Sequence, residues 1–172
     1  NGEIVELENA VDASDGVPVG QVRLRAPLPE PRRLACMAGN YMEGSKLVGD
    51  REAFLKSSSA VIGPGDTVEL PDCPAPHFHH EAELAIVIGK TAKHVMAEDA
   101  DQYIFGFVNF MDISARGINP NGGNSFFWGK SWDTFAPMGP AIVTYDEISD
   151  PHDLDVKLWV NGDLRQDLNT SD

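Results

Sequence analysis

The clearest predicted strand in the sequence lies within the segment His77-Phe78-His79-His80-Glu81-Ala82-Glu83-Leu84-Ala85-Ile86-Val87-Ile88-Gly89. Apolar residues dominate from Glu81 to Ile88, and Gly89 ends the run, as is typical of a strand. Because successive side chains of a strand point to opposite faces, this strand has two distinct faces. The face that carries both acidic residues consists of Glu81, Glu83, Ala85 and Val87. The other face is entirely apolar and is expected in the core: Ala82, Leu84, Ile86 and Ile88.

The pairing of Glu81 and Glu83 on one face predicts a cation site. Two carboxylates held side by side among apolar neighbours repel each other unless they are protonated, solvated or bridged by a cation. Their hard oxygen atoms favour Mg²⁺, Mn²⁺ or Ca²⁺ as that cation. The alternative is an exposed strand whose outer face is simply acidic.

The histidines of the same segment offer a second metal hypothesis. The spacing His77-x-His79-x-x-x-Glu83 is typical of a cupin metal motif, which would bind Fe, Mn or Zn through imidazole groups. A cupin also needs a downstream Pro-x-Gly-x-x-His motif, and its nearest candidate, which starts at Pro137, has no histidine in the last position. A zinc site built from Cys73 and these histidines would lack a convincing partner pair. The cupin hypothesis is therefore weaker than the carboxylate site, but it stays open.

The rest of the sequence also favours short strands. They are predicted at 34–38, 67–70, 103–111, 141–144 and 156–160. The best helix candidate is 96–102, where acidic residues gather near the start, and Asn161-Gly162 predicts a two-residue hairpin turn. Many short strands with one main helix predict a mainly-β or α+β domain.

The composition limits the classes of partner. The 172 residues contain 13 Lys and Arg against 27 Asp and Glu, a net charge of −14, which argues against binding nucleic acid or an anionic membrane surface. No apolar run approaches the roughly 20 residues that a membrane helix needs, and the first residues lack the pattern of a secretory signal. Cys36 and Cys73 are expected as reduced thiols in a cytoplasmic protein.

A proline-rich stretch from Pro27 to Pro31 marks a domain boundary. Residues 1–31 are predicted to be a small N-terminal segment and linker, with short strands and a turn at Ser14-Asp15-Gly16. Residues 32–172 then form the main domain, which is long enough to bury a core.

Several motifs in series carry a resemblance to a known family. They are the segment from His79 to Gly89, Asp112-Ile113-Ser114-Ala115-Arg116, Gly129-Lys130-Ser131-Trp132-Asp133-Thr134-Phe135-Ala136-Pro137-Met138-Gly139-Pro140, Asp150-Pro151-His152-Asp153-Leu154, and Val160-Asn161-Gly162-Asp163-Leu164-Arg165-Gln166-Asp167-Leu168-Asn169-Thr170-Ser171. From about Arg33 to the last residue, the chain resembles the fumarylacetoacetate hydrolase family. The resemblance implies a mixed β-sheet rolled into an open barrel, with a small N-terminal appendage, and a homodimer.

The resemblance also implies a set of site residues. In such proteins the positions of Glu81, Glu83 and Asp112 bind one divalent cation, here Mg²⁺ or alternatively Mn²⁺ or Ca²⁺. The positions of Arg116 and Lys130 hold the substrate or stabilise developing charge, so Lys130 is the expected catalytic residue. Asn119 stands where the family often has a glutamine that faces the substrate, and it is expected to bind substrate with Arg116. Pairing with a carboxylate is the structural alternative for Arg116, and surface exposure is the alternative for Lys130.

Two family features have no counterpart in this sequence. Family members usually carry a His and a Glu that activate water, just after an Asn-Tyr pair. Here Asn40-Tyr41 is followed by Met42-Glu43, and no histidine precedes His77. The segment that carries this His–Glu dyad is therefore either deleted from the protein or missing from this sequence. Family members also continue beyond Ser171 into further strands and a Gly-Thr-Pro loop, so the C-terminal part is expected to be truncated relative to the family.

The function implied is metal-dependent hydrolysis of a carbon–carbon bond in a small anionic 2-oxo acid of the acylpyruvate or fumarylpyruvate type. One alternative is decarboxylation or keto–enol isomerisation of a dicarboxylic 2-oxo acid, which needs no activated water. Another is a non-catalytic metal-binding relative. The aromatic cluster Phe126, Phe127 and Trp128, after the loop Gly122-Gly123-Asn124, is a candidate dimer contact, with a substrate gate and ordinary core packing as the alternatives.

Overall fold

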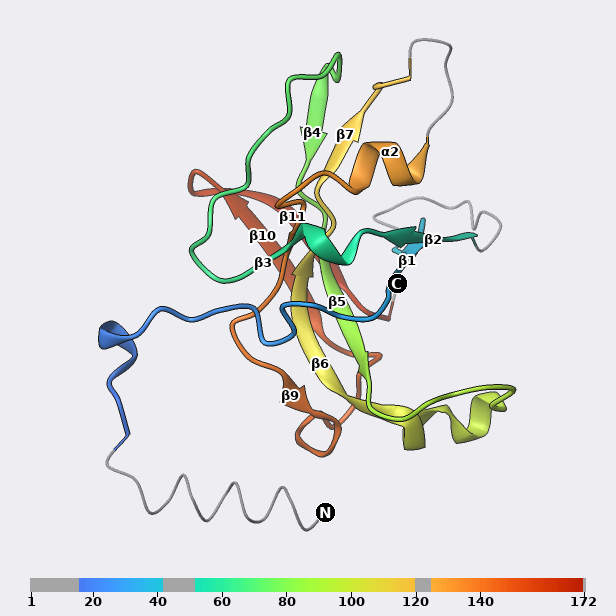
Figure 1. Ribbon diagram of the computed structural model, residues 1–172. Coiled ribbons are helices and arrows are strands. Elements are labelled where there is room, and N and C mark those ends of the chain that lie inside the picture. Colours follow the sequence, from blue (N-terminus) through green and yellow to red (C-terminus); the bar gives the residue numbers. More distant parts are fainter. Residues whose placement is uncertain (1–15, 42–51, 120–124, 172) are drawn as a thin grey trace.

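The computed structural model describes residues 16–41, 52–119 and 125–171, and short strands make up most of its regular structure (Figure 1). The strands are β1 (Leu34–Ala38), β2 (Glu52–Lys56), β3 (Val61–Ile62), β4 (His77–His79), β5 (Ala82–Ile88), β6 (Ile104–Met111), β7 (Ser114–Arg116), β8 (Ala136–Pro137), β9 (Val143–Thr144), β10 (Asp155–Val160) and β11 (Asp163–Asn169). The helical segments among these residues are α2 (Phe126–Lys130) and the 3₁₀ turns η1 (Val19–Gln21), η2 (Ser58–Ala60), η3 (Ala97–Tyr103) and η4 (Tyr145–Glu147). The mainly-β or α+β class is therefore confirmed.

The described strands pair in small sheets that do not close into a barrel. The largest sheet has the order β5-β6-β9 and is antiparallel. The pairs β1-β2, β4-β7 and β10-β11 are antiparallel and β3-β8 is parallel, so the sheet content is mixed, as expected. Figure 1 shows β5 and β6 running together through the centre of the molecule, and β10 contacts β5.

The core consists of two clusters of buried side chains. One contains Cys36, Ala60, Val108, Phe110, Ala136 and Met138. The other contains Ile113, Ala115, Ile118 and Phe135. Along the chain, β6 contributes Phe110 to the first cluster, Ile113 belongs to the second, and Asp112 lies between these two residues in sequence.

The predicted core face of β5 is wrong. Ile86 and Ile88 are 55% and 59% exposed, whereas Ala85 and Val87 pack against the first core cluster. Hydrophobic alternation fixes which side chains share a face, but here both faces are apolar at the far end of the strand. Packing against β6 determines which face of β5 is buried, because the buried β6 residues Val108 and Phe110 lie on the same side of the sheet as Ala85 and Val87.

The other expected elements are mostly present with shifted ends. The predicted helix is the 3₁₀ helix η3, and the predicted hairpin turn is confirmed, with φ of 53° at Asn161 and 88° at Gly162. The strand predicted at 67–70 is wrong: Glu69 donates its backbone N–H to the Thr134 hydroxyl (2.8 Å) instead of to a neighbouring strand.

The short strands predicted before the proline-rich stretch are absent from the part of that segment that the structure describes. Residues 16–31 contain η1 and no strand, and the chain from 22 to 33 has bends but no regular element. Residues 1–15, with Ser14 and Asp15 of the predicted turn, lie outside the described residues, as do Met42-Glu43 and Gly122-Gly123-Asn124.

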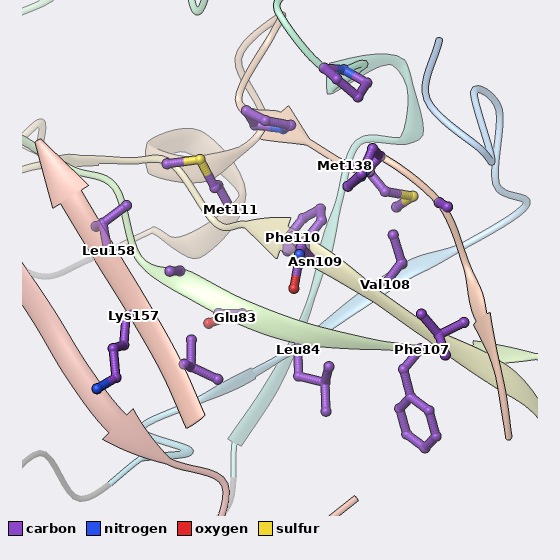
Figure 2. A pocket seen from close by; sticks show the side chains of 18 of the residues that line it. Glu83, Leu84, Phe107, Val108, Asn109, Phe110, Met111, Met138, Lys157 and Leu158 are labelled. Carbon is purple, nitrogen blue, oxygen red and sulfur yellow. The ribbon is translucent and has the colours of Figure 1, made fainter. Parts of the chain in front are cut away.

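A cavity of about 960 Å³ is lined by β5, β6, β10 and the segments around Gly63 and Pro140. Leu84 of β5, Phe107 of β6 and Leu158 of β10 are among the side chains around it (Figure 2). Both cysteines are free thiols, Cys36 in the core and Cys73 half-buried. In the described ranges, no helix combines the length and the apolar character needed to cross a membrane.

Candidate metal centre

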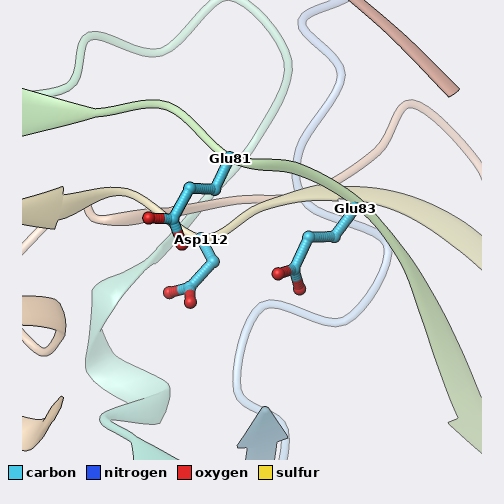
Figure 3. A group of neighbouring side chains, drawn as sticks. All are labelled: Glu81, Glu83 and Asp112. Atoms are coloured by element: carbon cyan, nitrogen blue, oxygen red, sulfur yellow. The ribbon is translucent and has the colours of Figure 1, made fainter. Parts of the chain in front are cut away.

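The structure brings Glu81, Glu83 and Asp112 together at one end of the β5–β6 pair (Figure 3). Glu83 belongs to β5, Glu81 directly precedes that strand, and Asp112 directly follows β6. One carboxylate oxygen of each residue lies within 4.8 Å of the others. The antiparallel register, in which Ala82 faces Met111, explains why the start of one strand and the end of the other meet here.

The backbone at Glu81 differs from the predicted strand. Glu81 has φ of 46°, in the left-handed region that non-glycine residues rarely adopt, and β5 begins one residue later. The Asp112 N–H donates to the Glu81 carbonyl oxygen (2.9 Å), which joins two of the three acidic residues through the backbone. The two glutamates therefore face the same space because of this turn, and not through strand alternation alone.

Three cationic side chains surround the carboxylates. Lys130 Nζ donates to Glu81 Oε2 (2.6 Å) and to Asp112 Oδ2, so its ammonium group bridges two acidic residues. Lys56 Nζ donates to Asp112 Oδ1 and to the Ile113 carbonyl oxygen (3.0 Å). Arg116 pairs with Glu81 through Nη2, and its Nε donates to His79 Nδ1 (3.3 Å).

Burial gives these contacts their strength. Asp112 is 1% exposed, Lys56 3% and Lys130 5%. Charges removed from water are costly unless they are paired, so the lysines and Asp112 stabilise one another as a unit. Arg116 remains partly exposed and is the cation of the centre most open to solvent.

The pKa values of the two glutamate carboxyl groups are shifted in opposite directions. Burial, and then the negative charge of Asp112, raise the pKa of Glu83 to about 7. Burial also disfavours ionisation of Glu81, but hydrogen bonds and charge from Lys130, followed by Arg116, outweigh it and hold the pKa of Glu81 below its usual range. Glu83 has no ion pair with any described residue, and it is the group that a bound cation would stabilise most.

Lys130 reaches the centre because α2 lies close to β7. A Cβ atom at Gly129 would come within 2.9 Å of the Ala115 carbonyl oxygen, so only glycine allows this approach without a shift. The Ser125 hydroxyl accepts a hydrogen bond from the Trp128 N–H (3.2 Å) and caps the start of the helix. The Lys130 ammonium lies 5.1 Å from the centroid of the Phe54 ring, which stacks on Phe126 (4.7 Å between centroids).

The sequence also predicted roles for Asn119 and for the histidines of β4, of which His79 has its Nδ1 atom 3.6 Å from Glu81 Oε1. Asn119 is half-buried on the segment after β7, in contact with neighbouring groups. His77 and His79 lie on β4 and are exposed. Within the described ranges the one group of three or more metal-ligand side chains is Glu81, Glu83 and Asp112, so no three-ligand site formed by His77, His79 or Cys73 supports the cupin or zinc hypotheses.

Sequence reasoning missed Lys56. Its signal was present, because the alternation Phe54-Leu55-Lys56 on a strand places an aromatic and a lysine on one face. A lysine is almost never fully buried unless it is paired, and only the fold shows that its partner is Asp112.

A β-rich fold with three carboxylates and three cations around one small space defines a candidate divalent-metal centre for an anionic ligand. A model of the fumarylacetoacetate (FAA) hydrolase C-terminal domain matches residues 33–172. The chain belongs to the fumarylacetoacetate hydrolase family.

Similar proteins include enzymes with different reactions. The mitochondrial oxaloacetate tautomerase Fahd2a of Rattus norvegicus is 38% identical over 160 residues, covering 90% of this chain and 51% of that protein. The structure of maleylpyruvate hydrolase from Sphingobium sp. SYK-6, in complex with manganese(II) and pyruvate, superposes with a TM-score of 0.86 at 40% identity, covering 99% of this chain and 60% of that one. A 5-carboxymethyl-2-hydroxymuconate delta-isomerase from Mycobacterium smegmatis has a TM-score of 0.80 at 37% identity, covering 92% and 63%. The chain thus spans about half the length of the curated relative.

Proposed function

We propose that this chain carries the metal- and substrate-binding centre of an enzyme that interconverts the keto and enol forms of a small dicarboxylic 2-oxo acid. The observation that carries the proposal is the buried Lys130 ammonium group, held between Glu81 and Asp112 near the Glu83 carboxyl group, which has no ion pair among the described residues. This arrangement combines a site for a divalent cation with a fixed donor to the substrate. Tautomerase activity in a relative at 38% identity supports the same reaction.

The donor set fits a hard divalent cation, Mg²⁺ or Mn²⁺. Glu81, Glu83 and Asp112 would hold it with one oxygen each, which leaves positions for the oxygens of a ligand. When bound, such a cation supplies positive charge that favours the enolate form of a 2-oxo acid. A neighbour's structure with manganese(II) and pyruvate, itself a 2-oxo acid, supports this choice of metal and ligand class.

The chain's own cations take the other roles. Arg116 is the more exposed cation and would bind a carboxylate of the substrate. Lys130 would donate a hydrogen bond to the oxygen on which negative charge develops, because its ammonium group is held rigidly at the centre. Asn119 is proposed to contact the substrate from the segment after β7.

Hydrolysis of a carbon–carbon bond is the second candidate. It is favoured by the 40% identity to a maleylpyruvate hydrolase. Both reactions move a proton, but hydrolysis also consumes a water molecule that a base must activate, and this sequence has no histidine before His77 for that role. This difference places tautomerisation first, and decarboxylation or a non-catalytic role follows only if neither reaction is found.

The experiment measures three reactions of the purified chain with Mg²⁺, with Mn²⁺ and after chelation: keto–enol conversion of oxaloacetate, its decarboxylation, and cleavage of acylpyruvates. Metal-dependent tautomerisation is expected to dominate.

Lys130→Met should lower kcat by about two to three orders of magnitude, the usual scale for one electrostatic donor, and leave the affinity for the metal unchanged. Lys157→Met is the matched control, because Lys157 is exposed on β10 and pairs only with Asp167 among the described residues (3.4 Å). Full kcat in Lys130→Met, or cleavage faster than tautomerisation, would contradict the proposal.

A further inference from the structure

Gln166 of β11 makes two hydrogen bonds to the residue between the two glutamates. The Ala82 N–H donates to Gln166 Oε1 (2.9 Å), and Gln166 Nε2 donates to the Ala82 carbonyl oxygen (2.9 Å). A carboxamide has both a donor and an acceptor, so it can serve both backbone groups of one residue, as a neighbouring strand would. The side chain of Gln166 thus replaces strand pairing at this point.

The edge of β5 explains why such a substitute is needed. On one edge β5 pairs with β6, and on the other the described residues include no strand that is hydrogen-bonded to it. Ala82 is half-buried there, and buried backbone groups are almost always paired. The β10–β11 hairpin packs against this edge and supplies the pairing through one side chain.

The same contact lies next to a strained residue. Glu81 has φ of 46°, and its carbonyl oxygen is held by the Asp112 N–H (2.9 Å). A non-glycine residue stays in the left-handed region only where its surroundings fix it from more than one side. Asp112 fixes the backbone from β6, and Gln166 fixes the next peptide unit from the opposite edge.

We propose that Gln166 is a positioning residue of the metal centre, which sets the direction of Glu81 and Glu83 by holding both backbone groups of Ala82. This inference rests on the metal site of the proposed function, but not on which reaction the enzyme performs. Groups that orient metal ligands typically change metal affinity by about tenfold to a hundredfold when they are removed. A role limited to attaching the hairpin would change stability and leave affinity unchanged.

The test uses the metal-depleted chain and Mn²⁺ alone, with free Mn²⁺ followed by electron paramagnetic resonance. Gln166→Met keeps the length of the side chain and removes both hydrogen bonds, and we expect it to lower Mn²⁺ affinity by about tenfold or more. Gln166→Asn keeps the amide but is one methylene too short to hold both groups, and we expect a similar loss. Gln102→Met is the matched control, because Gln102 is exposed on η3 and bonds only to Asp99 among the described contacts.

Hydrogen exchange at the Ala82 amide gives a second readout that needs no metal. We expect faster exchange in Gln166→Met and unchanged exchange in Gln102→Met. Unchanged Mn²⁺ affinity in Gln166→Met would overturn the positioning role whether or not exchange at Ala82 becomes faster, and so would two Gln166 variants that fail to fold, since the contact would then be structural. A wild-type chain that binds no Mn²⁺ would overturn the metal site and this inference together. A wild type that binds Mn²⁺ but converts no 2-oxo acid would overturn the proposed reaction, with Gln166 still judged by affinity.

Discussion

At the scale of single residues, Glu83 differs from its two acidic neighbours. Glu81 and Asp112 are paired with lysine or arginine, whereas Glu83 is half-buried near Asp112 without an ion pair among the described residues. Its pKa of about 7 lies above its ordinary value, so the metal-free folded chain binds a proton that the unfolded chain has already released near pH 6. This group therefore makes the metal-free chain less stable as pH rises from about 4.5 to about 7.

The raised pKa of Glu83 predicts proton release on metal binding. At pH 6 the carboxyl group is mostly protonated, so Mg²⁺ must displace close to one proton, and at pH 8 it displaces almost none. Mg²⁺ affinity should therefore rise between pH 6 and pH 8. Calorimetry in buffers of different ionisation enthalpy measures the released protons directly. Glu83→Gln should remove the release, and equal release at both pH values would show that Glu83 is not the titrating ligand.

The buried ion pair between Lys56 and Asp112 predicts that substitution of Lys56 lowers the stability of the fold. The Lys56 ammonium group is fully buried against Asp112, so Lys56→Met leaves a buried carboxylate with Lys130 as its remaining cation among the described residues. Breaking a buried pair costs about 3 kcal/mol or more of unfolding free energy, whereas loss of an exposed lysine usually changes it by less than about 0.5 kcal/mol. Urea unfolding of Lys56→Met, compared with Lys157→Met on the surface, measures the difference. Equal stability of the two variants would show that the buried pair is not needed.

At the scale of secondary-structure elements, α2 places Lys130 because Gly129 lets the helix approach β7. Gly129→Ala adds a methyl group within 2.9 Å of the Ala115 carbonyl oxygen, so the helix must shift outward. We expect a loss of about 1 to 3 kcal/mol of stability and a lower kcat, because Lys130 moves away from Glu81 and Asp112. Gly20→Ala is the matched control, since a Cβ atom there would meet open space. Unchanged kcat in Gly129→Ala would show that the position of α2 is not important for the centre.

The secondary-structure elements differ in how well the sequence alone predicts them. Alternation and turn residues were enough for β5, β10 and the Asn161-Gly162 turn, because these depend on neighbours along the chain. The core face of β5 was missed because both faces are apolar near Ile86, and packing against β6 decides between them. Proximity of Glu81, Glu83 and Asp112 was expected through the family resemblance, whereas Lys56 and Gln166 depend on contacts between distant segments.

At the scale of the whole molecule, exposed aromatic side chains bear on the proposed homodimer. Phe127 and Trp128 of α2 are 63% and 48% exposed, while Phe126 is half-buried against Phe54. Large exposed aromatic residues are costly in water and are enriched at the centres of interfaces. The two exposed side chains therefore remain candidates for a contact between copies, and the third belongs to the packing of Lys130.

The dimer proposal predicts a change in mass on substitution of Trp128. Wild type should sediment as a dimer at micromolar concentration, and Trp128→Ser should shift it toward the monomer, because burial of one aromatic side chain often contributes 2 kcal/mol or more at an interface, about a thirtyfold change in the dissociation constant. Trp159→Ser is the matched control, since Trp159 is 57% exposed on β10, away from α2 in sequence. If Trp128 instead guards the substrate site, Trp128→Ser should change KM and leave the mass unchanged. A wild-type chain that sediments as a monomer would contradict the dimer and leave that second role for the aromatic pair.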